Sequence, residues 1–298
     1  MIKIRVPATS ANLGAGFDCM GVAVALYNYI YMDFSKRLEI VSLDGFKVPT
    51  GKSNLIYKSA VFLFETCGFK NLKGLKIEQK NNIFQTRGLG SSSACIVAGL
   101  MGANALLGFP VKKRDILNMA TKLEGHPDNV APAIFGGMVV CAVENGRVCY
   151  VKNNVSSRLK FVFFVPNFKM DTNKARQILR KEVLLKDAVF NISRAGLFIS
   201  SVINGRFLNL KLAVQDRLHQ NSRLDVIENG RDIFKIAYKF GAYGVYLSGA
   251  GPSIVAICDR CNRYFERNVC LKLKELGIKG WSVFNFKLDR QGVVAETF

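Results

Sequence analysis

The stretch RGLGSSSACIVAG, residues 87–99, constrains the fold of this chain more than any other. Two glycines flank a leucine, three serines follow, and an apolar run of small residues begins at once. Glycines allow a tight turn, and a helix that begins after such a turn directs free N–H groups at an anion. The stretch has no lysine, so it is not a P-loop. The pattern predicts a phosphate-binding loop whose bound charge must be neutralised by another group.

The helix after this loop is expected to be buried. Residues 93–111 carry no charge and are nearly long enough to span a bilayer. However, they contain Gly99, Gly102, Asn104 and Pro110, and polar segments surround them. A buried helix is therefore favoured over a membrane span.

Strands and helices alternate on both sides of one polar segment, which indicates an α+β protein of two domains. The chain has 298 residues, of which 49% are hydrophobic, enough for two folded cores. The polar segment at residues 152–158 predicts domains at residues 1–155 and 156–298. Residues 172–240 are expected to be mostly helical. Further helices are expected at residues 53–66, from about 92, 112–123 and 262–276, and strands at 2–6, 27–34, 74–80, 135–143, 160–165, 243–247, 254–258 and 281–286.

Charge and cysteine content exclude some classes of function. The net charge is +20, but the basic residues are scattered, with no run longer than residues 112–114. Nucleic-acid-binding proteins concentrate such residues on one face, so a general attraction for anions is the simpler interpretation. The eight cysteines are expected to be small buried hydrophobic residues, and Cys258 and Cys261 lack the second pair that a zinc site needs. No apolar signal segment follows residues 1–5, so we expect a cytoplasmic protein.

Four other motifs accompany the loop: PATSANLGAGFDCMG (7–21), LEGHPDNVAPAIFGG (123–137), DTNKAR (171–176) and SGAGPS (248–253). In this order and spacing, the chain resembles the GHMP kinase superfamily and, within it, the homoserine kinase family. The resemblance implies an N-terminal domain of the ribosomal-S5-domain-2-like type and a ferredoxin-like C-terminal domain. It also implies an ATP-dependent kinase that phosphorylates the side-chain hydroxyl of L-homoserine, a step toward threonine.

The resemblance assigns ATP and Mg²⁺ to the Gly/Ser loop. Backbone N–H groups and the helix dipole would hold the phosphates, and Mg²⁺ would neutralise the remaining charge. By position Glu124 is the magnesium carboxylate and Ser92 its partner, while Asn54 matches a position near the adenine. The expected ATP-binding residues are Asn54, Arg87, Gly88, Leu89, Gly90, Ser91, Ser92 and Ser93.

The resemblance also implies how the substrate is held. Asp18 would bind its ammonium, and arginines would bind its carboxylate, because guanidinium and carboxylate geometries match. The family pattern T-x-x-A-R falls on Thr172 and Arg176, and the motif HQNSR gives Arg223. The expected substrate-binding residues are Asn12, Asp18, His126, Asp128, Arg176 and Arg223.

The expected catalytic residues are Asn129, Glu124 and Thr172, with Thr172 near the transferred phosphate. Related kinases with a catalytic aspartate carry it where this chain has Asn129, and an amide cannot accept a full proton near neutral pH. We therefore expect no dedicated general base, since phosphoryl transfer depends mainly on positioning and charge neutralisation.

Two alternatives stay open. The first is another GHMP kinase acting on a different small alcohol, although residues 7–18 lack the lysine of mevalonate-type members. The second is a basic nucleic-acid-binding protein with an S5-like domain, which the phosphate loop disfavours. The expected partners are L-homoserine and a second copy of the chain in a homodimer, with neither nucleic acid nor membrane.

Overall fold

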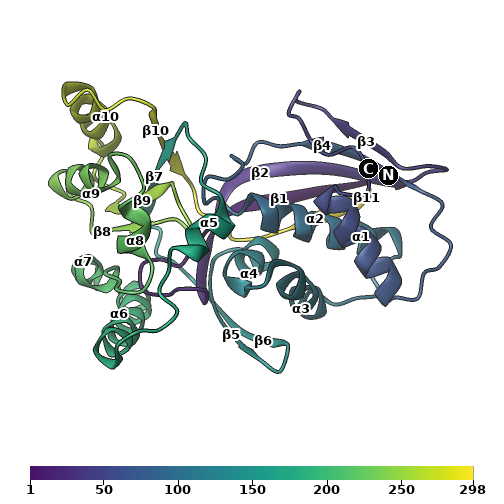
Figure 1. The fold of residues 1–298 in the computed structure, drawn as a ribbon, viewed down its shortest axis with the longest axis horizontal. Helices are drawn as coiled ribbons and strands as arrows, with labels where there is room; N and C mark the ends of the chain where they lie inside the picture. Colours follow the sequence, from purple (N-terminus) through teal and green to yellow (C-terminus); the bar gives the residue numbers. More distant parts are fainter. Residues whose placement is uncertain (298) are drawn as a thin grey trace.

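The computed structural model describes residues 1–297, except for the side chains of residues 172 and 173. Two β-sheets lie one after the other along the long axis of the molecule (Figure 1). The first sheet has the order β11-β1-β2-β4-β3, and β5 pairs with both β2 and β6. Its strands are β1 (Ile2–Ala11), β2 (Met20–Phe34), β3 (Glu39–Ser42), β4 (Leu75–Lys80), β5 (Met138–Glu144), β6 (Arg147–Asn153) and β11 (Val294–Thr297).

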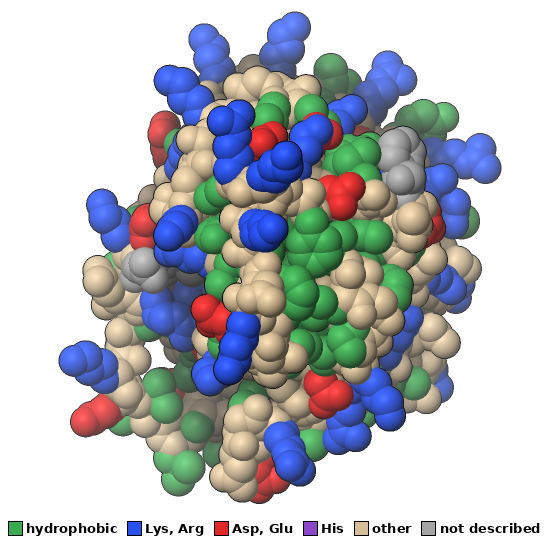
Figure 2. Space-filling view, turned by 90° about the vertical axis from the view of Figure 1, so that its right-hand side faces the viewer, with side chains coloured by type: hydrophobic (Ala, Val, Ile, Leu, Met, Phe, Trp, Pro, Cys, Tyr) green, Lys and Arg blue, Asp and Glu red, His purple; other side chains and the backbone are tan. Residues whose placement is uncertain are grey.

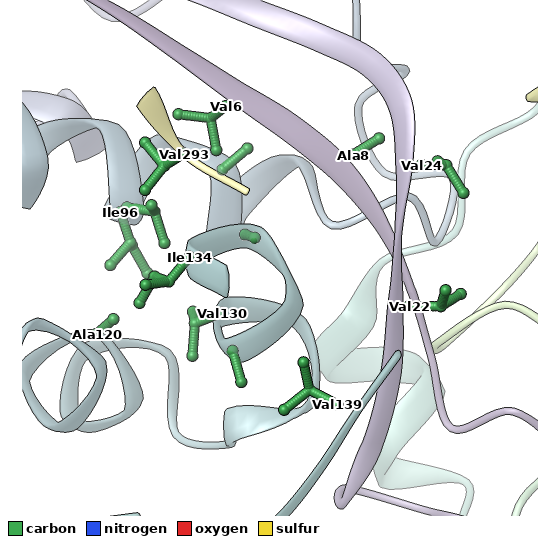
Figure 3. Close-up of a cluster of buried hydrophobic side chains, with 14 of the residues drawn as sticks. Val6, Ala8, Val22, Val24, Ile96, Ala120, Val130, Ile134, Val139 and Val293 are labelled. Atoms are coloured by element: carbon green, nitrogen blue, oxygen red, sulfur yellow. The ribbon is translucent and has the colours of Figure 1, made fainter. Parts of the chain in front are cut away.

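Four helices pack together with this sheet: α1 (Leu55–Thr66), α2 (Ser91–Leu106), α3 (Lys113–Glu124) and α4 (Pro127–Phe135). Side chains of α2, α3 and α4 meet those of β1, β2 and β5 in one apolar core (Figure 3). Gly99 lets α2 lie against α1, because a Cβ there would meet the carbonyl oxygen of Ile56 at 2.3 Å. The predicted buried helix is confirmed.

The second sheet has the order β10-β7-β9-β8. Its strands are β7 (Leu159–Pro166), β8 (Gly244–Leu247), β9 (Ile254–Asp259) and β10 (Trp281–Phe286). The mostly helical region expected between β7 and β8 is confirmed. The helices of this half are α5 (Thr172–Gln177), α6 (Leu185–Ile203), η1 (Phe207–Asn209), α7 (Leu210–Ala213), α8 (Gln220–Leu224), α9 (Gly230–Lys239) and α10 (Phe265–Glu275).

The chain crosses between the two sheets twice, at residues 154–158 and 287–293. After the second crossing β11 pairs antiparallel with β1, so the two termini lie side by side (Figure 1). The predicted boundary after residue 155 stays a prediction. Residues 156–298, predicted to form the second domain, nevertheless contribute their last strand to the first sheet.

The GHPDN motif, residues 125–129, leads into α4 and forms its first turn. Pro127 occupies the first turn, where a missing N–H costs nothing. Pro132 cannot donate to the carbonyl of Asp128, and β2 approaches that oxygen closely at Gly21, where a Cβ would lie 1.8 Å from it. The short helix therefore fixes Asp128 and Asn129 against the first sheet.

The surface carries the basic residues over many elements. Figure 2 shows Lys and Arg side chains spread around an apolar patch on the end of the molecule near β3 and α1. Among the described helices, none has both the length and the apolar character that crossing a bilayer requires. The expectation that the cysteines are buried is wrong for four of them, since Cys67, Cys149, Cys261 and Cys270 are exposed.

Candidate active site

A cleft of about 280 Å³ lies between the two halves, at the start of α2. Its walls come from the segment after β1, the loop before α2, the start of α4, α5, α8 and the loop after β8. The lining residues are Asn12, Phe17, Asp18, Gln85, Thr86, Gly88, Leu89, Gly90, Ser91, Ser92, Cys95, Glu124, His126, Asp128, Asn129, Arg176, Arg223, Gly249 and Ala250.

The loop before α2 requires its two glycines. Gly88 and Gly90 have φ angles of +74° and +67°, in the left-handed region. A Cβ on Gly88 would meet the carbonyl oxygen of Ser248 at 2.2 Å, and one on Gly90 would meet Oγ1 of Thr9 at 1.9 Å. None of the side chains that the structure describes caps the start of α2, so its first N–H groups are left for another acceptor at the edge of the cleft.

Glu124 closes one side of this loop. It is the last residue of α3, and its Oε1 accepts hydrogen bonds from Oγ of Ser92 and Oγ of Ser93, both at 2.7 Å. One carboxylate and two hydroxyls thus gather beside the first turn of α2. An all-oxygen donor set of this kind suits Mg²⁺.

The cluster of Asp18, His126 and Asp128 is a second candidate for a metal, since its donor atoms lie within 4.8 Å of one another. Both oxygens of Asp18 accept from Arg176, and Asp128 Oδ1 contacts Nδ1 of His126 at 2.6 Å. These carboxylates therefore already have partners, and the set includes a nitrogen donor. The donor set of Glu124 fits Mg²⁺ better.

Two residues assigned to ATP from the sequence have other contacts. Arg87 donates to the carbonyl oxygens of Gln85, Pro166 and Asn167, which ties the loop to the end of β7. Burial lowers the pKa of its guanidinium. Asn54 is buried and caps α1, because its Oδ1 accepts from the N–H groups that begin the helix. Neither of these residues lines the cleft, and Ser93 of the loop does not line it either, so the contact of all three with ATP stays a prediction.

Asp18 and Arg176 form a two-pronged ion pair across the cleft. Nη1 and Nη2 of Arg176 donate to the two carboxylate oxygens at 2.9 and 2.8 Å. Asn12 holds Asp18 in place, because its Oδ1 accepts from the backbone N–H of Asp18 and its Nδ2 donates to the carbonyl of Gly249. The charges predicted to bind a zwitterion are therefore brought together.

Arg223 lies next to this pair and is only 2% exposed. Its Nε donates to the carbonyl of Ala175 at 3.1 Å, and its Nη1 donates to that of Gly249 at 3.3 Å. The guanidinium carbons of Arg176 and Arg223 lie 5.5 and 5.3 Å from the ring centre of Phe17. Burial, and then the charge of Arg176, lower the pKa of Arg223 to about 10.

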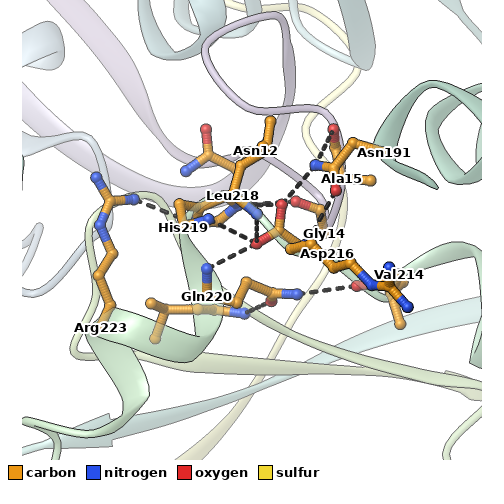
Figure 4. A network of polar contacts seen from close by, with 12 residues as sticks. Asn12, Gly14, Ala15, Asn191, Val214, Asp216, Leu218, His219, Gln220 and Arg223 are labelled. Carbon is orange, nitrogen blue, oxygen red and sulfur yellow. Dashed lines mark hydrogen bonds and ion pairs between the residues drawn. The ribbon is translucent and has the colours of Figure 1, made fainter. Parts of the chain in front are cut away.

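A buried polar network behind the cleft orients Arg223 (Figure 4). Asp216 Oδ2 accepts from the backbone N–H groups of residues 218, 219 and 220, which fixes the start of α8. His219 Nε2 must donate to the carbonyl of Gly14 at 2.9 Å, so a neutral ring leaves Nδ1 to accept from Arg223 at 3.2 Å. Burial lowers the pKa of His219, which favours this neutral form.

The start of α4 adds a chain of polar contacts to the cleft. Nδ1 of His126 contacts Asp128, Nδ2 of Asn129 donates to Asp128, and Oγ1 of Thr9 donates to Oδ1 of Asn129 at 2.8 Å. Burial acts to lower the pKa of His126, but the hydrogen bond and charge of Asp128 raise it above its ordinary value. The orientation of the Asn129 amide is therefore fixed by both of its neighbours.

The cleft contains all six residues that the sequence assigned to the substrate, together with Glu124 and Asn129. Thr172 begins α5, but its side chain lies outside the described part of the structure. Sequence reasoning named the SGAGPS motif without assigning any of its residues to the site. It missed Phe17, Gln85, Thr86, Cys95, Gly249 and Ala250, of which Phe17 could have been found as the aromatic residue beside Asp18.

Comparisons with known proteins agree with this arrangement. Residues 54–137 match the family described as GHMP kinases N terminal domain, and residues 198–263 match GHMP kinases C terminal. A homoserine kinase of Clostridium botulinum strain Eklund 17B is 45% identical, with 98% of this chain and 97% of that protein covered. One of Caldicellulosiruptor saccharolyticus is also 45% identical, with 98% and 96% covered.

The crystal structure of homoserine kinase from Cytophaga hutchinsonii has a similar fold. Its TM-score is 0.88 at 28% identity, and the match covers 99% of this chain and 97% of that one. The predicted two-domain, mixed α+β fold is thereby confirmed. These matches show that the chain belongs to the GHMP kinase family.

Proposed function

We propose that this protein is an ATP-dependent homoserine kinase. It transfers the γ-phosphate of ATP to the side-chain hydroxyl of L-homoserine, giving O-phospho-L-homoserine in threonine biosynthesis. Its full-length relatives have this name. The observation that carries the proposal is that the Gly88–Ser92 loop shares one cleft with the Asp18–Arg176 ion pair. A phosphate cradle lies beside groups that match both charges of an amino acid.

The ion pair supports recognition of a zwitterion. Asp18 binds the ammonium of the substrate, and Arg176 and Arg223 bind its carboxylate. Because Asp18 and Arg176 pair with each other, a ligand with both charges replaces both ends of that pair. A ligand with only one charge leaves an acceptor or a donor without a partner, which is costly at a half-buried site. Asn12, His126 and Asp128 complete the substrate pocket.

The loop supports binding of the ATP phosphates. The N–H groups of residues 88–93 contact the phosphate oxygens, and the N-terminal end of the α2 dipole favours their charge. Glu124 and Ser92 would hold Mg²⁺, which supplies the positive charge that the loop lacks. Asn54 near the adenine and Arg87 at the loop complete the proposed ATP site.

The reaction needs little covalent chemistry from the protein. The transition state of phosphoryl transfer is loose, so the attacking hydroxyl develops little charge before the new bond forms. Asn129 orients this hydroxyl, since contacts with Thr9 and Asp128 hold its amide in place. Thr172 is proposed to contact the transferred phosphate.

The main competing function is another GHMP kinase with a different small alcohol as acceptor. The test compares ADP release with equal concentrations of L-homoserine, mevalonate and galactose at saturating MgATP. Homoserine should be preferred by at least about a hundredfold in kcat/KM, since the other two lack the ammonium that Asp18 requires. A preference for either of the others would replace the proposed substrate and leave the kinase assignment intact.

A cytoplasmic location and a homodimer are two further proposals. Cell fractionation and sedimentation analysis test them. Recovery in the membrane fraction would contradict the cytoplasmic location. A sedimentation mass of one chain at micromolar concentration would contradict the homodimer.

A further inference from the structure

A second pocket, of about 530 Å³, lies at the seam between the two sheets and shares no lining residue with the catalytic cleft. Part of its wall comes from the first chain crossing and β7, and part from the turn between β9 and α10. The start of α10, the end of β10 and the second crossing contribute the rest. Its lining residues are Ser156, Ser157, Leu159, Lys160, Phe161, Arg260, Arg263, Glu266, Asn285, Phe286, Lys287, Leu288 and Arg290.

The walls of this pocket carry an excess of positive charge. Five lining residues are basic, and Glu266 is the one acidic lining residue among those described. Glu266 already has its own partners, because buried Lys160 contacts both of its oxygens at 2.9 and 2.8 Å and Asn285 donates to it at 2.8 Å. The charges of the other four basic side chains are therefore not neutralised by any carboxylate of the pocket.

Three of these four cationic side chains have no hydrogen-bond or ion-pair partner among the described residues. In the described structure, the side chains of Arg260, Arg263 and Lys287 contact no hydrogen-bond acceptor or carboxylate. Arg290 donates to the backbone carbonyl of Val155 at 3.2 Å, which leaves its charge in place. Cations around a concave, low-dielectric wall raise the local concentration of anions.

The net charge of the chain does not by itself explain this pocket. A third pocket, of about 500 Å³, has four basic lining residues, against five in the seam pocket. Three of them contact carboxylates: Arg217 with Asp187, Arg231 with Asp225 and Lys235 with Asp232. Three of the four basic residues of the third pocket therefore have acidic partners, whereas Lys160 is the one basic residue of the seam pocket that has one among the described residues.

We propose that the seam pocket binds a small polyanion with two or more phosphate or carboxylate groups. Two arginines present the planar donors that both groups prefer, Lys287 and Arg290 add charge, and the volume is that of an ordinary metabolite site. Such a ligand would contact both chain crossings, which Arg290 already joins through Val155. The proposal does not depend on the identity of the phosphate acceptor in the catalytic cleft.

Calorimetric titration tests this site on the whole protein, with the catalytic cleft filled by saturating ADP. Pyrophosphate and citrate are the two probes, one for each anionic group. We expect one further site per chain with a dissociation constant below about 1 mM for at least one probe. Binding of a single probe supports the site and identifies the group that it takes.

Variants distinguish this site from general attraction to a basic protein. Arg260→Gln with Arg263→Gln should weaken probe binding by about tenfold or more. The matched control, Lys70→Gln with Lys73→Gln, removes the same charge from exposed positions outside both pockets and should change binding by less than about twofold. Ser157→Asp adds a negative charge at an exposed position of the wall and should also weaken binding. Equal losses in the control and the arginine variant, or no binding of either probe, would overturn the proposal.

Discussion

Arg176 illustrates how one side chain can set substrate choice. In the free protein its guanidinium pairs with the carboxylate of Asp18, so both side chains have a partner before the substrate binds. Arg176→Ala should raise KM for L-homoserine by about tenfold or more, since a charge-assisted hydrogen bond contributes roughly 1.5–3 kcal/mol. KM for ATP should change little. Steady-state kinetics measure both constants.

Arg180→Ala is the matched control for this prediction, because Arg180 is exposed in the same region and does not line the cleft. Its KM for homoserine should match that of the wild type. If Arg176→Ala and Arg223→Ala both leave this KM unchanged, the carboxylate is bound elsewhere.

Glu124 is the proposed magnesium carboxylate. Glu124→Gln should lower kcat by about two orders of magnitude or more and raise the Mg²⁺ concentration needed for half-maximal rate, because a neutral amide is a poor ligand for a hard cation. The melting temperature should change little. Glu144→Gln, at an exposed position outside the cleft, is the control. An unchanged magnesium requirement in Glu124→Gln would show that another group holds the metal.

The absence of a general base is testable through pH. If His126 were the base, its raised pKa means that activity would grow as pH rises through a value above 6.5, and His126→Gln would abolish that rise. We expect instead that kcat against pH keeps its shape in Asn129→Ala, His126→Gln and Asp128→Asn. A positioned base contributes roughly 10²–10⁴-fold. One variant would identify a base if its kcat fell by that factor, if the acidic limb of its pH profile disappeared and if its substrate affinity stayed the same.

At the scale of elements, the start of α2 depends on Gly90. Gly90→Ala places a methyl group where Oγ1 of Thr9 lies, at a positive φ angle that costs alanine roughly 1–2 kcal/mol. Gly108→Ala is the control, because its φ angle is +77° and a Cβ there meets nothing within 4 Å. Chemical unfolding should show a lower free energy of unfolding for both variants, with the larger decrease for Gly90→Ala. The rate of phosphoryl transfer should fall for Gly90→Ala and stay unchanged for Gly108→Ala. Equal transfer rates in the two variants would contradict the proposed role of the loop.

Local sequence patterns predict some elements and miss others for a physical reason. The small-residue run of α2 and the alternation of residues 27–34 are local signals, and α2 begins close to where it was expected. The strand expected at residues 27–34 is the second half of β2, which begins earlier, at Met20. By contrast, α4 begins and continues with prolines, which read as turn residues, and β11 is a strand of four residues at the end of the chain. The helix α4 packs on β1 and β2, and β11 pairs with β1, so tertiary contacts stabilise both elements. Tertiary contacts of this kind cannot be predicted from a short stretch of sequence.

At the scale of the whole molecule, motifs far apart in sequence define the site better than composition does. Asp18, His126 and Arg176 come from three motifs, and all three line one cleft. Their identity, but not their distances, follows from the resemblance to a family. The capping contacts of Asn54 are local to the start of α1, so a sequence pattern could have indicated them. The position of Phe17 beside two arginines depends on packing between segments, so the sequence alone could not provide it.

Homoserine kinase activity is tested by following phosphorus through the reaction. Wild-type protein, MgATP and L-homoserine are incubated together, and ³¹P NMR records ADP, inorganic phosphate and phosphate monoester over time. We expect one monoester on the homoserine hydroxyl for each ADP formed, and little ADP without homoserine. If ADP appears at the same rate with and without homoserine, or with inorganic phosphate as the only second product, the protein is not a homoserine kinase.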